Sequence, residues 1–172
     1  MVFRHQTPPS TSDADQFSSP ARRPRSRVLV AFAAMLAVLL GSGLLTSCES
    51  TPADRAAVLN AVNASRAANG LAPVVENGIL DLKADKWAQH MRDVCNISHS
   101  TLREGAPPNW LKLGENVGRG GTIEIIHDAY MNSPGHRANI LDPAFNQMGV
   151  AAVWGDCDGM RTVFTVHVFM KA

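Results

Sequence analysis

The sequence predicts an α+β domain in which helices come first and strands come last. Two segments near its start, 53–70 and 79–95, carry apolar residues at helical spacing. Two segments rich in Val and Phe, 146–155 and 161–171, close the chain and have the composition of strands. Because one more strand is expected in the long segment between these groups, the order of elements favours helices layered on a sheet.

The ends of the first helix are marked by residue types that start or stop helices. Thr51 is a good N-cap, and Pro52 suits the first helical position. Gly70 ends the first helix, and Pro73 keeps the following link extended. The second helix has one buried face, formed by Ile79, Leu80, Ala84, Trp87, Ala88 and Met91.

A long irregular segment, 96–121, follows the second helix. A loop of this length in a compact domain is usually functional or held in place by side chains. A third helix is expected over 122–131 and a short fourth helix over 133–141, before Pro143. The sequence DCDG at 156–159 predicts a hairpin turn between the last two strands.

The start of the chain has the pattern of an export signal. Residues 1–27 are polar and basic, and residues 28–45 are apolar throughout. The sequence LTSC at 45–48 resembles the bacterial lipobox, in which the chain is cut before the cysteine and Cys48 is lipidated. An uncleaved transmembrane anchor is the alternative, because the apolar run is long enough to span a bilayer. Both interpretations place the domain outside the cell membrane and anchored to its outer face.

Cleavage before Cys48 would divide the chain into three parts. Residues 1–47 would be the signal peptide with its lipobox, 48–52 a lipidated tether, and 53–172 a single domain. From residue 48 onward, 11 basic and 13 acidic side chains give a net charge of −2. Because no basic stripe remains, no nucleic-acid partner is expected. The membrane is the expected partner, through the lipid on Cys48.

Two cysteines remain after Cys48, and they are expected to pair. Export places Cys95 and Cys157 in a compartment that permits disulfides. Two separate buried thiols are the alternative. Neither cysteine has neighbours at metal-ligand spacing, which argues against a metal site at either.

Six motifs follow one another along the domain: NASRAANGLAPV, LKADKWAQHM, HS at 99–100, GEN at 114–116, SPGHRANIL and FNQMGVAAVW. In this order they resemble the CAP superfamily, or SCP-like proteins, which includes cysteine-rich secretory proteins, insect venom antigens and plant pathogenesis-related proteins. The short bacterial branch is the most similar. The resemblance implies a three-layer α–β–α sandwich with a small, mainly antiparallel sheet.

The same resemblance implies a shallow cleft in which two histidines and two acidic residues gather. The matching positions are His99, Glu115 and His136. The second acidic residue of the family lies on the helix before the second histidine, after an aromatic. Here that position falls in YMN at 130–132, which has no acidic residue.

Two imidazoles can bind a divalent metal such as zinc, which is the one cofactor that the motifs suggest. Glu115 would be a third ligand, or would orient a histidine by accepting its other N–H. A metal-dependent hydrolase would use the same three residues, with Glu115 as the base that acts on metal-bound water. The structural alternative is that Glu115 holds the long loop while His99 and His136 pack as ordinary polar residues.

A few other side chains receive simpler roles. Ser133 is expected to cap the fourth helix, and Arg137 to bind a carboxylate of the fold. His127 is expected to face the cleft. The sequence leaves open which face of the sheet His167 occupies. Core or lid positions are expected for the three tryptophans, Trp87, Trp110 and Trp154.

The sequence favours a binding module over an enzyme. It contains no G-x-S-x-G elbow, no close carboxylate pair of the glycosidase type and no phosphate loop. The expected ligand is a lipid, a peptide or another component of the cell envelope, held in the cleft. A metal-dependent hydrolase and a purely structural envelope protein are the alternatives.

Overall fold

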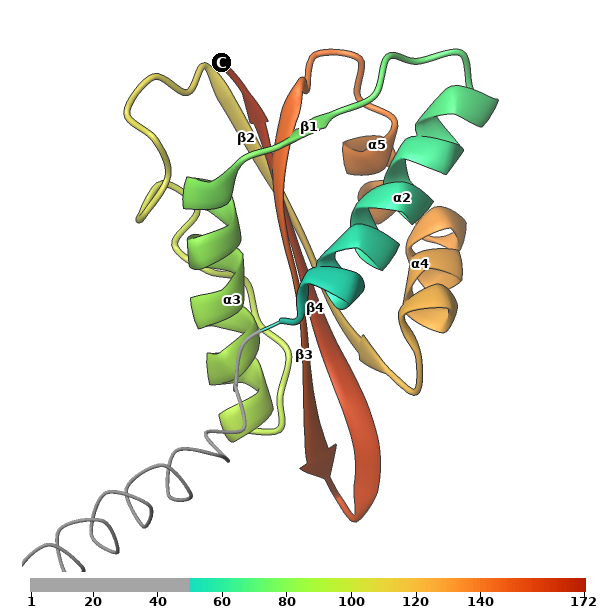
Figure 1. The fold of residues 1–172 in the computed structure, drawn as a ribbon, viewed down its shortest axis with the longest axis vertical. Helices are drawn as coiled ribbons and strands as arrows, with labels where there is room; N and C mark the ends of the chain where they lie inside the picture. Colours follow the sequence, from blue (N-terminus) through green and yellow to red (C-terminus); the bar gives the residue numbers. More distant parts are fainter. Residues whose placement is uncertain (1–49) are drawn as a thin grey trace, which may run out of the picture. The chain divides into compact units, whose positions relative to one another are not determined.

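The computed structural model describes residues 50–172, which form a four-stranded sheet with helices on both faces (Figure 1). The predicted signal peptide, lipobox and lipidation site at Cys48 lie outside these described residues. Within 50–172, no helix has the length and apolar character needed to cross a membrane.

Apart from the two-residue strand β1, which lies in the segment expected to be an extended link, the elements follow the predicted order of helices and strands. They are α2 (Pro52–Ala68), β1 (Val75–Glu76), α3 (Gly78–Asp93), β2 (Lys112–Gly120), α4 (Ile123–Asn132), α5 (Pro134–Ile140), β3 (Gln147–Cys157) and β4 (Met160–Lys171). In the sheet the strand order is β1-β3-β4-β2, with β1 parallel to β3 and the other pairs antiparallel. The predicted fold class, a sandwich around a small and mainly antiparallel sheet, is confirmed.

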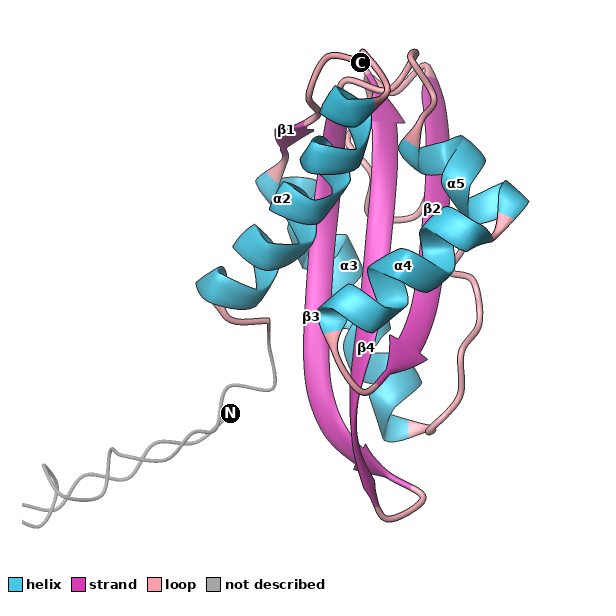
Figure 2. Ribbon diagram, turned by 90° about the vertical axis from the view of Figure 1, so that its right-hand side faces the viewer, coloured by secondary structure: helices cyan, strands magenta, loops and turns pink. Residues whose placement is uncertain are grey.

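Two hydrophobic clusters form the core, one on each face of the sheet. Helices α2, α4 and α5 cover one face, and α3 covers the other (Figure 2). At Gly149 of β3 the helix comes so close that an added Cβ would lie 2.1 Å from the backbone carbonyl carbon of Leu80. Glycine therefore permits the contact between α3 and the sheet.

Side-chain caps start three of the helices as their residue types suggest. Thr51, Asn77 and Thr122 each accept hydrogen bonds from backbone N–H groups in the first turn of α2, α3 and α4, respectively. The hairpin turn is tighter than DCDG predicts, because β3 runs to Cys157 and β4 starts at Met160. The two residues between them both have positive φ, as a two-residue hairpin turn of type I′ requires.

Arg66 is a fully buried cation that joins three parts of the chain. From α2 its guanidinium donates hydrogen bonds to the carbonyls of Ala72, Ile140, Asp142 and Phe145, at 2.8 to 3.0 Å. Only 1% of its surface is exposed. It thereby fixes the end of α5 and the loop to β3 against α2.

The predicted disulfide is confirmed. Cys95 and Cys157 are bonded, with their Cα atoms 5.6 Å apart and a sequence separation of 62 positions. The bond joins the turn after α3 to the end of β3. It therefore fixes the start of the loop that leads to the candidate site.

Ser50 is part of the folded domain rather than of a tether. It is buried, and its N–H and hydroxyl both donate to Oδ1 of Asp85, at 3.1 and 2.6 Å. The same hydroxyl accepts the backbone N–H of Ala152 at 2.7 Å. Arg55 pairs with the other oxygen of Asp85. The folded part thus includes residues 50–52, which the sequence assigns to the tether.

Candidate functional site

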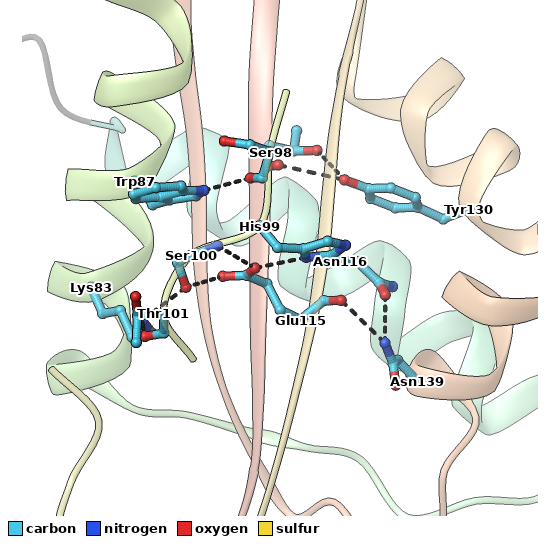
Figure 3. A network of polar contacts seen from close by, with 11 residues as sticks. Lys83, Trp87, Ser98, His99, Ser100, Thr101, Glu115, Asn116, Tyr130 and Asn139 are labelled. Carbon is cyan, nitrogen blue, oxygen red and sulfur yellow. Dashed lines mark hydrogen bonds and ion pairs between the residues drawn. The ribbon is translucent and has the colours of Figure 1, made fainter. Parts of the chain in front are cut away.

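Glu115 lies near the middle of β2, and its buried carboxylate holds the loop that follows α3 (Figure 3). Oε1 accepts the backbone N–H of Ser100 at 2.9 Å and contacts Nδ1 of His99 at 2.8 Å. Oε2 accepts the hydroxyl of Ser100 at 2.5 Å. The structure therefore brings together two of the three residues expected in the cleft, and adds Ser100 to them.

His99 contacts Glu115 through one ring nitrogen and has an exposed side chain. A carboxylate only accepts hydrogen bonds, so Nδ1 of His99 must carry the proton shared with Glu115. In the neutral ring, Nε2 is then an acceptor. The side chain is 63% exposed. Glu115 thus orients an imidazole whose second nitrogen is available at the surface.

His136 lies in the first turn of α5 and is held from two sides. Its Nδ1 is 2.8 Å from Oγ of Ser133, and its ring packs against Tyr130 with centroids 4.9 Å apart. Burial, and secondarily the nearby His99, lower the pKa of His136. Ser133 occupies the expected N-cap position of α5, but its hydroxyl binds this imidazole and makes no capping hydrogen bond.

Two asparagines connect β2 to α5 beside these histidines (Figure 3). The amide of Asn139 donates to Oδ1 of Asn116 at 2.9 Å and to the carbonyl of Glu115 at 3.2 Å. Asn116 in turn donates to the carbonyl of His136 at 3.0 Å. Because Asn116 is fully buried, this chain of amides sets the position of α5 relative to Glu115.

The rings of Tyr130 and His167 extend the contacts of His136 towards the sheet. The hydroxyl of Tyr130 is 2.9 Å from Oγ1 of Thr165, and its ring contacts His167 edge-on at 5.0 Å. His167 is therefore on the α4 side of the sheet, which settles the open question of its face. Burial, followed by the nearby His127 and His136, lowers the pKa of His167 to about 3.

Two other expectations are wrong. His127 contacts Oγ of Ser65 on α2 at 2.8 Å and lies between two helices, not in the cleft. Arg137 meets the side-chain oxygen of Asn69 at 3.4 Å, and not a carboxylate. Helical spacing alone does not say which neighbouring helix a polar side chain will meet, and both errors have this origin.

A groove of about 330 Å³ runs along β2 between the loop and α4. Its lining is mostly apolar: Ile97, Val117, Ile125, Ile126, Ala129 and Tyr130, with Gly118 and Arg119 on the strand. Ser133 and His136 are its other polar members. Of the three predicted cleft residues, only His136 lines this groove, while His99 and Glu115 lie outside its lining.

The donor geometry favours one of the two roles predicted for Glu115. Its contact with Nδ1 of His99 is the orienting role, and its two hydrogen bonds from Ser100 hold the long loop, as in the structural alternative. Within residues 50–172, no three or more His, Cys, Asp or Glu side chains are grouped so as to hold a metal ion.

The fold and the order of these residues define the class of protein. The family model for the cysteine-rich secretory protein family, CAP, matches residues 59–169. The chain therefore belongs to the CAP family.

A curated bacterial protein is similar to this chain in sequence. The "Uncharacterized protein YkwD" of Bacillus subtilis strain 168 is 34% identical over 114 residues, which cover 61% of this chain and 44% of that protein. The chain thus spans less than half the length of this curated relative.

Solved structures share the fold at low sequence identity. An outer surface protein from Borrelia burgdorferi has a TM-score of 0.58 and 18% identity, over 70% of this chain and 94% of that one. An extracellular SCP-domain protein from Bacillus anthracis str. Ames has a TM-score of 0.58 and 21% identity, over 70% of this chain and 41% of that one.

Proposed function

We propose that this protein is an exported lipoprotein, anchored through Cys48 to the outer face of the cell membrane, whose groove binds a ligand with an apolar chain and a polar group. The apolar run at 28–45 and the lipobox support the export and the anchor. The names of the two structural relatives, an outer surface protein and an extracellular protein, fit the same location. The observation that carries the binding role is the apolar groove that ends at His136.

The walls of the groove expose large apolar side chains to solvent. Ile97 of the loop is 44% exposed, and Ile125 of α4 is 59% exposed. Ligand pockets are commonly lined by apolar side chains with a few polar groups, and have volumes from about 300 Å³. An apolar chain of a ligand bound between these walls would remove both side chains from water. This burial stabilises the complex by about 25 cal/mol per Å² of apolar surface.

The polar end of the groove suits a neutral hydrogen-bonding group. The lowered pKa keeps His136 uncharged near neutral pH. Its Nδ1 is bonded to Ser133, so Nε2 is the atom left to meet a ligand. A carbonyl, hydroxyl or amide of a lipid or peptide fits this position better than a free carboxylate does.

Native mass spectrometry of the protein isolated gently from its own membrane tests the binding role. An extra mass is expected on the wild type, and its loss is expected in Ile97→Ser and in His136→Ala. Val94→Ser is the matched control, because Val94 is 52% exposed in the same segment but does not line the groove. The proposed binding role would be contradicted by an extra mass that persists in Ile97→Ser, or by protein without any extra mass in every sample.

The anchor and the metal have separate readouts in the same preparation. Cys48→Ser should abolish the acyl mass and release the protein from the membrane, and retention of both would contradict lipidation. A zinc-sized mass lost in both His99→Ala and His136→Ala would support metal binding at the two imidazoles. An unchanged melting temperature after chelation would contradict metal binding.

No contact within residues 50–172 favours the hydrolase alternative, because Glu115 is already engaged by three hydrogen bonds.

A further inference from the structure

A second pocket, separate from the groove, lies between α3 and the loop that follows it. Its volume is about 280 Å³. Lys83, Lys86 and Trp87 line it from α3, and Ser100, Thr101 and Glu104 line it from the loop. Residues three and four positions apart share one face of a helix, so the two ammonium groups and the indole point to the same side.

Hydrogen bonds hold this pocket in shape (Figure 3). The indole N–H of Trp87 donates to the carbonyl of Ser98 at 2.6 Å. The ammonium of Lys83 donates to Oγ of Ser100 at 2.9 Å and to the carbonyl of Thr101 at 3.0 Å. Because Ser100 is also bound to Glu115, the loop wall is tied to both α3 and the sheet. A ligand would meet a pocket that is already formed.

The residues that line the pocket carry more positive than negative charge. Within residues 50–172, neither Lys83 nor Lys86 forms an ion pair with a carboxylate. The two hydrogen bonds of Lys83 go to neutral oxygens, and an ammonium has three donors. Burial lowers the pKa of Lys83, and the nearby carboxylates of Glu115 and Glu104 offset only part of this cost, which a bound anion would reduce further. The lining has two ammonium groups and one carboxylate, that of Glu104. The formal charge of the lining is therefore +1, which suits a monoanion.

The aromatic and hydroxyl groups of the pocket indicate what the anion is attached to. Trp87 packs against the core cluster on the α3 side and also borders the pocket, so its role exceeds that of a core residue. An indole offers an apolar face, while Thr101 and Glu104 offer hydrogen-bonding oxygens beside it. A sugar ring has matching apolar C–H faces and hydroxyl edges.

We propose that this pocket binds a sugar acid, with the carboxylate between Lys83 and Lys86 and the ring against Trp87. The volume, near the lower end for ligand pockets, suits one sugar unit. The proposal is independent of the groove, whose lining shares no residue with this pocket.

Nuclear magnetic resonance of the full chain in detergent micelles, with ¹⁵N-labelled tryptophan, tests the proposal. The chain has three tryptophans, so three indole N–H signals are expected. Titration with glucuronate should change the chemical shift of the Trp87 signal until the site is saturated. The signals of Trp110 and Trp154 should not move. Glucose lacks the carboxylate and acetate lacks the ring, and each should bind at least about tenfold more weakly than glucuronate.

A lysine pair provides the matched variants. Lys86→Gln removes one ammonium that makes no hydrogen bond within the described domain, and should weaken glucuronate binding about tenfold. Lys171→Gln removes an exposed ammonium on β4, outside the pocket, and should leave the affinity unchanged. The proposal is overturned by an unmoved Trp87 signal, by equal binding of glucose or acetate, or by unchanged affinity in Lys86→Gln.

Discussion

The carboxylate of Glu115 accepts both the backbone N–H and the hydroxyl of Ser100, at 2.9 and 2.5 Å. One side chain of the sheet thus fixes a loop that has no helix or strand of its own at this point. Glu115→Ala should destabilise the domain by about 1–2 kcal/mol, because it leaves the half-buried donors of Ser100 without an acceptor. Hydrogen exchange at the Ser100 amide should accelerate with it. Glu76→Ala, at an exposed position of β1, should change stability by less than about 0.5 kcal/mol.

Arg66 should be the most sensitive polar position in the domain. Arg66→Met keeps much of the volume but leaves the carbonyls of Ile140 and Phe145, among others, without their donor. We expect a loss of about 3–5 kcal/mol in the free energy of unfolding, measured in urea. Arg137→Met removes an exposed guanidinium with one long contact, and should cost less than about 0.5 kcal/mol. Similar losses in both variants would contradict the joining role of Arg66.

Gly149 and Gly135 should respond to alanine in opposite ways. A Cβ at position 149 would overlap the backbone of Leu80, so Gly149→Ala must push α3 away from the sheet. The expected cost is about 3 kcal/mol or more. A Cβ at Gly135 in α5 meets nothing within 4 Å, and alanine there should stabilise by up to about 1 kcal/mol. Thermal melting of the two variants separates these outcomes.

The Cys95–Cys157 bond should contribute mainly through the unfolded chain. Its two cysteines are separated by 62 positions, and for a loop of this length chain entropy gives about 4 kcal/mol. Cys95→Ala with Cys157→Ala should therefore lower stability by up to that amount without changing the circular dichroism of the folded state. A loss of secondary structure under native conditions would instead mean that the bond is needed for folding itself.

His167 should make the domain less stable in acid. In the folded state its pKa is about 3, whereas the unfolded side chain titrates near 6.5. Between these values the unfolded state binds more protons, so stability falls as the pH falls from about 6.5 towards 3. One histidine contributes at most about 1.4 kcal/mol per pH unit. His167→Phe should reduce the pH dependence of the free energy of unfolding, measured by urea denaturation between pH 4 and 7. An unchanged pH dependence would contradict this origin.

Much of the fold could be predicted because its signals are local. The caps of α2, α3 and α4 and the turn at Asp158 lie within a few residues of the elements that they bound. Strand β2 was harder to place, because KLGENVGRG has three glycines and little of the Val and Phe content that marks β3 and β4. It is held in the sheet by pairing with β4, and glycines such as Gly118 make room for Tyr130 and Ile126.

The candidate site could be predicted in part for a related reason. His99 and Glu115 stand in motifs, and the structure places them in contact. The amide chain through Asn139 and the buried guanidinium of Arg66 depend on contacts across 23 and 74 positions of sequence, respectively. Residue type and spacing carry no sign of such distant partners, so these roles are visible only when the chain is folded.

The buried position of Ser50 bears on how a lipid anchor would act. Two residues of extended chain reach about 7 Å, so an acyl group on Cys48 would leave almost no slack between bilayer and domain. Such a short connection would suppress tumbling and keep one flank of the protein next to the phospholipid headgroups. A Gly-Ser insertion before Ser50 would let the domain reorient freely above the bilayer, and the difference would appear in its fluorescence anisotropy on vesicles.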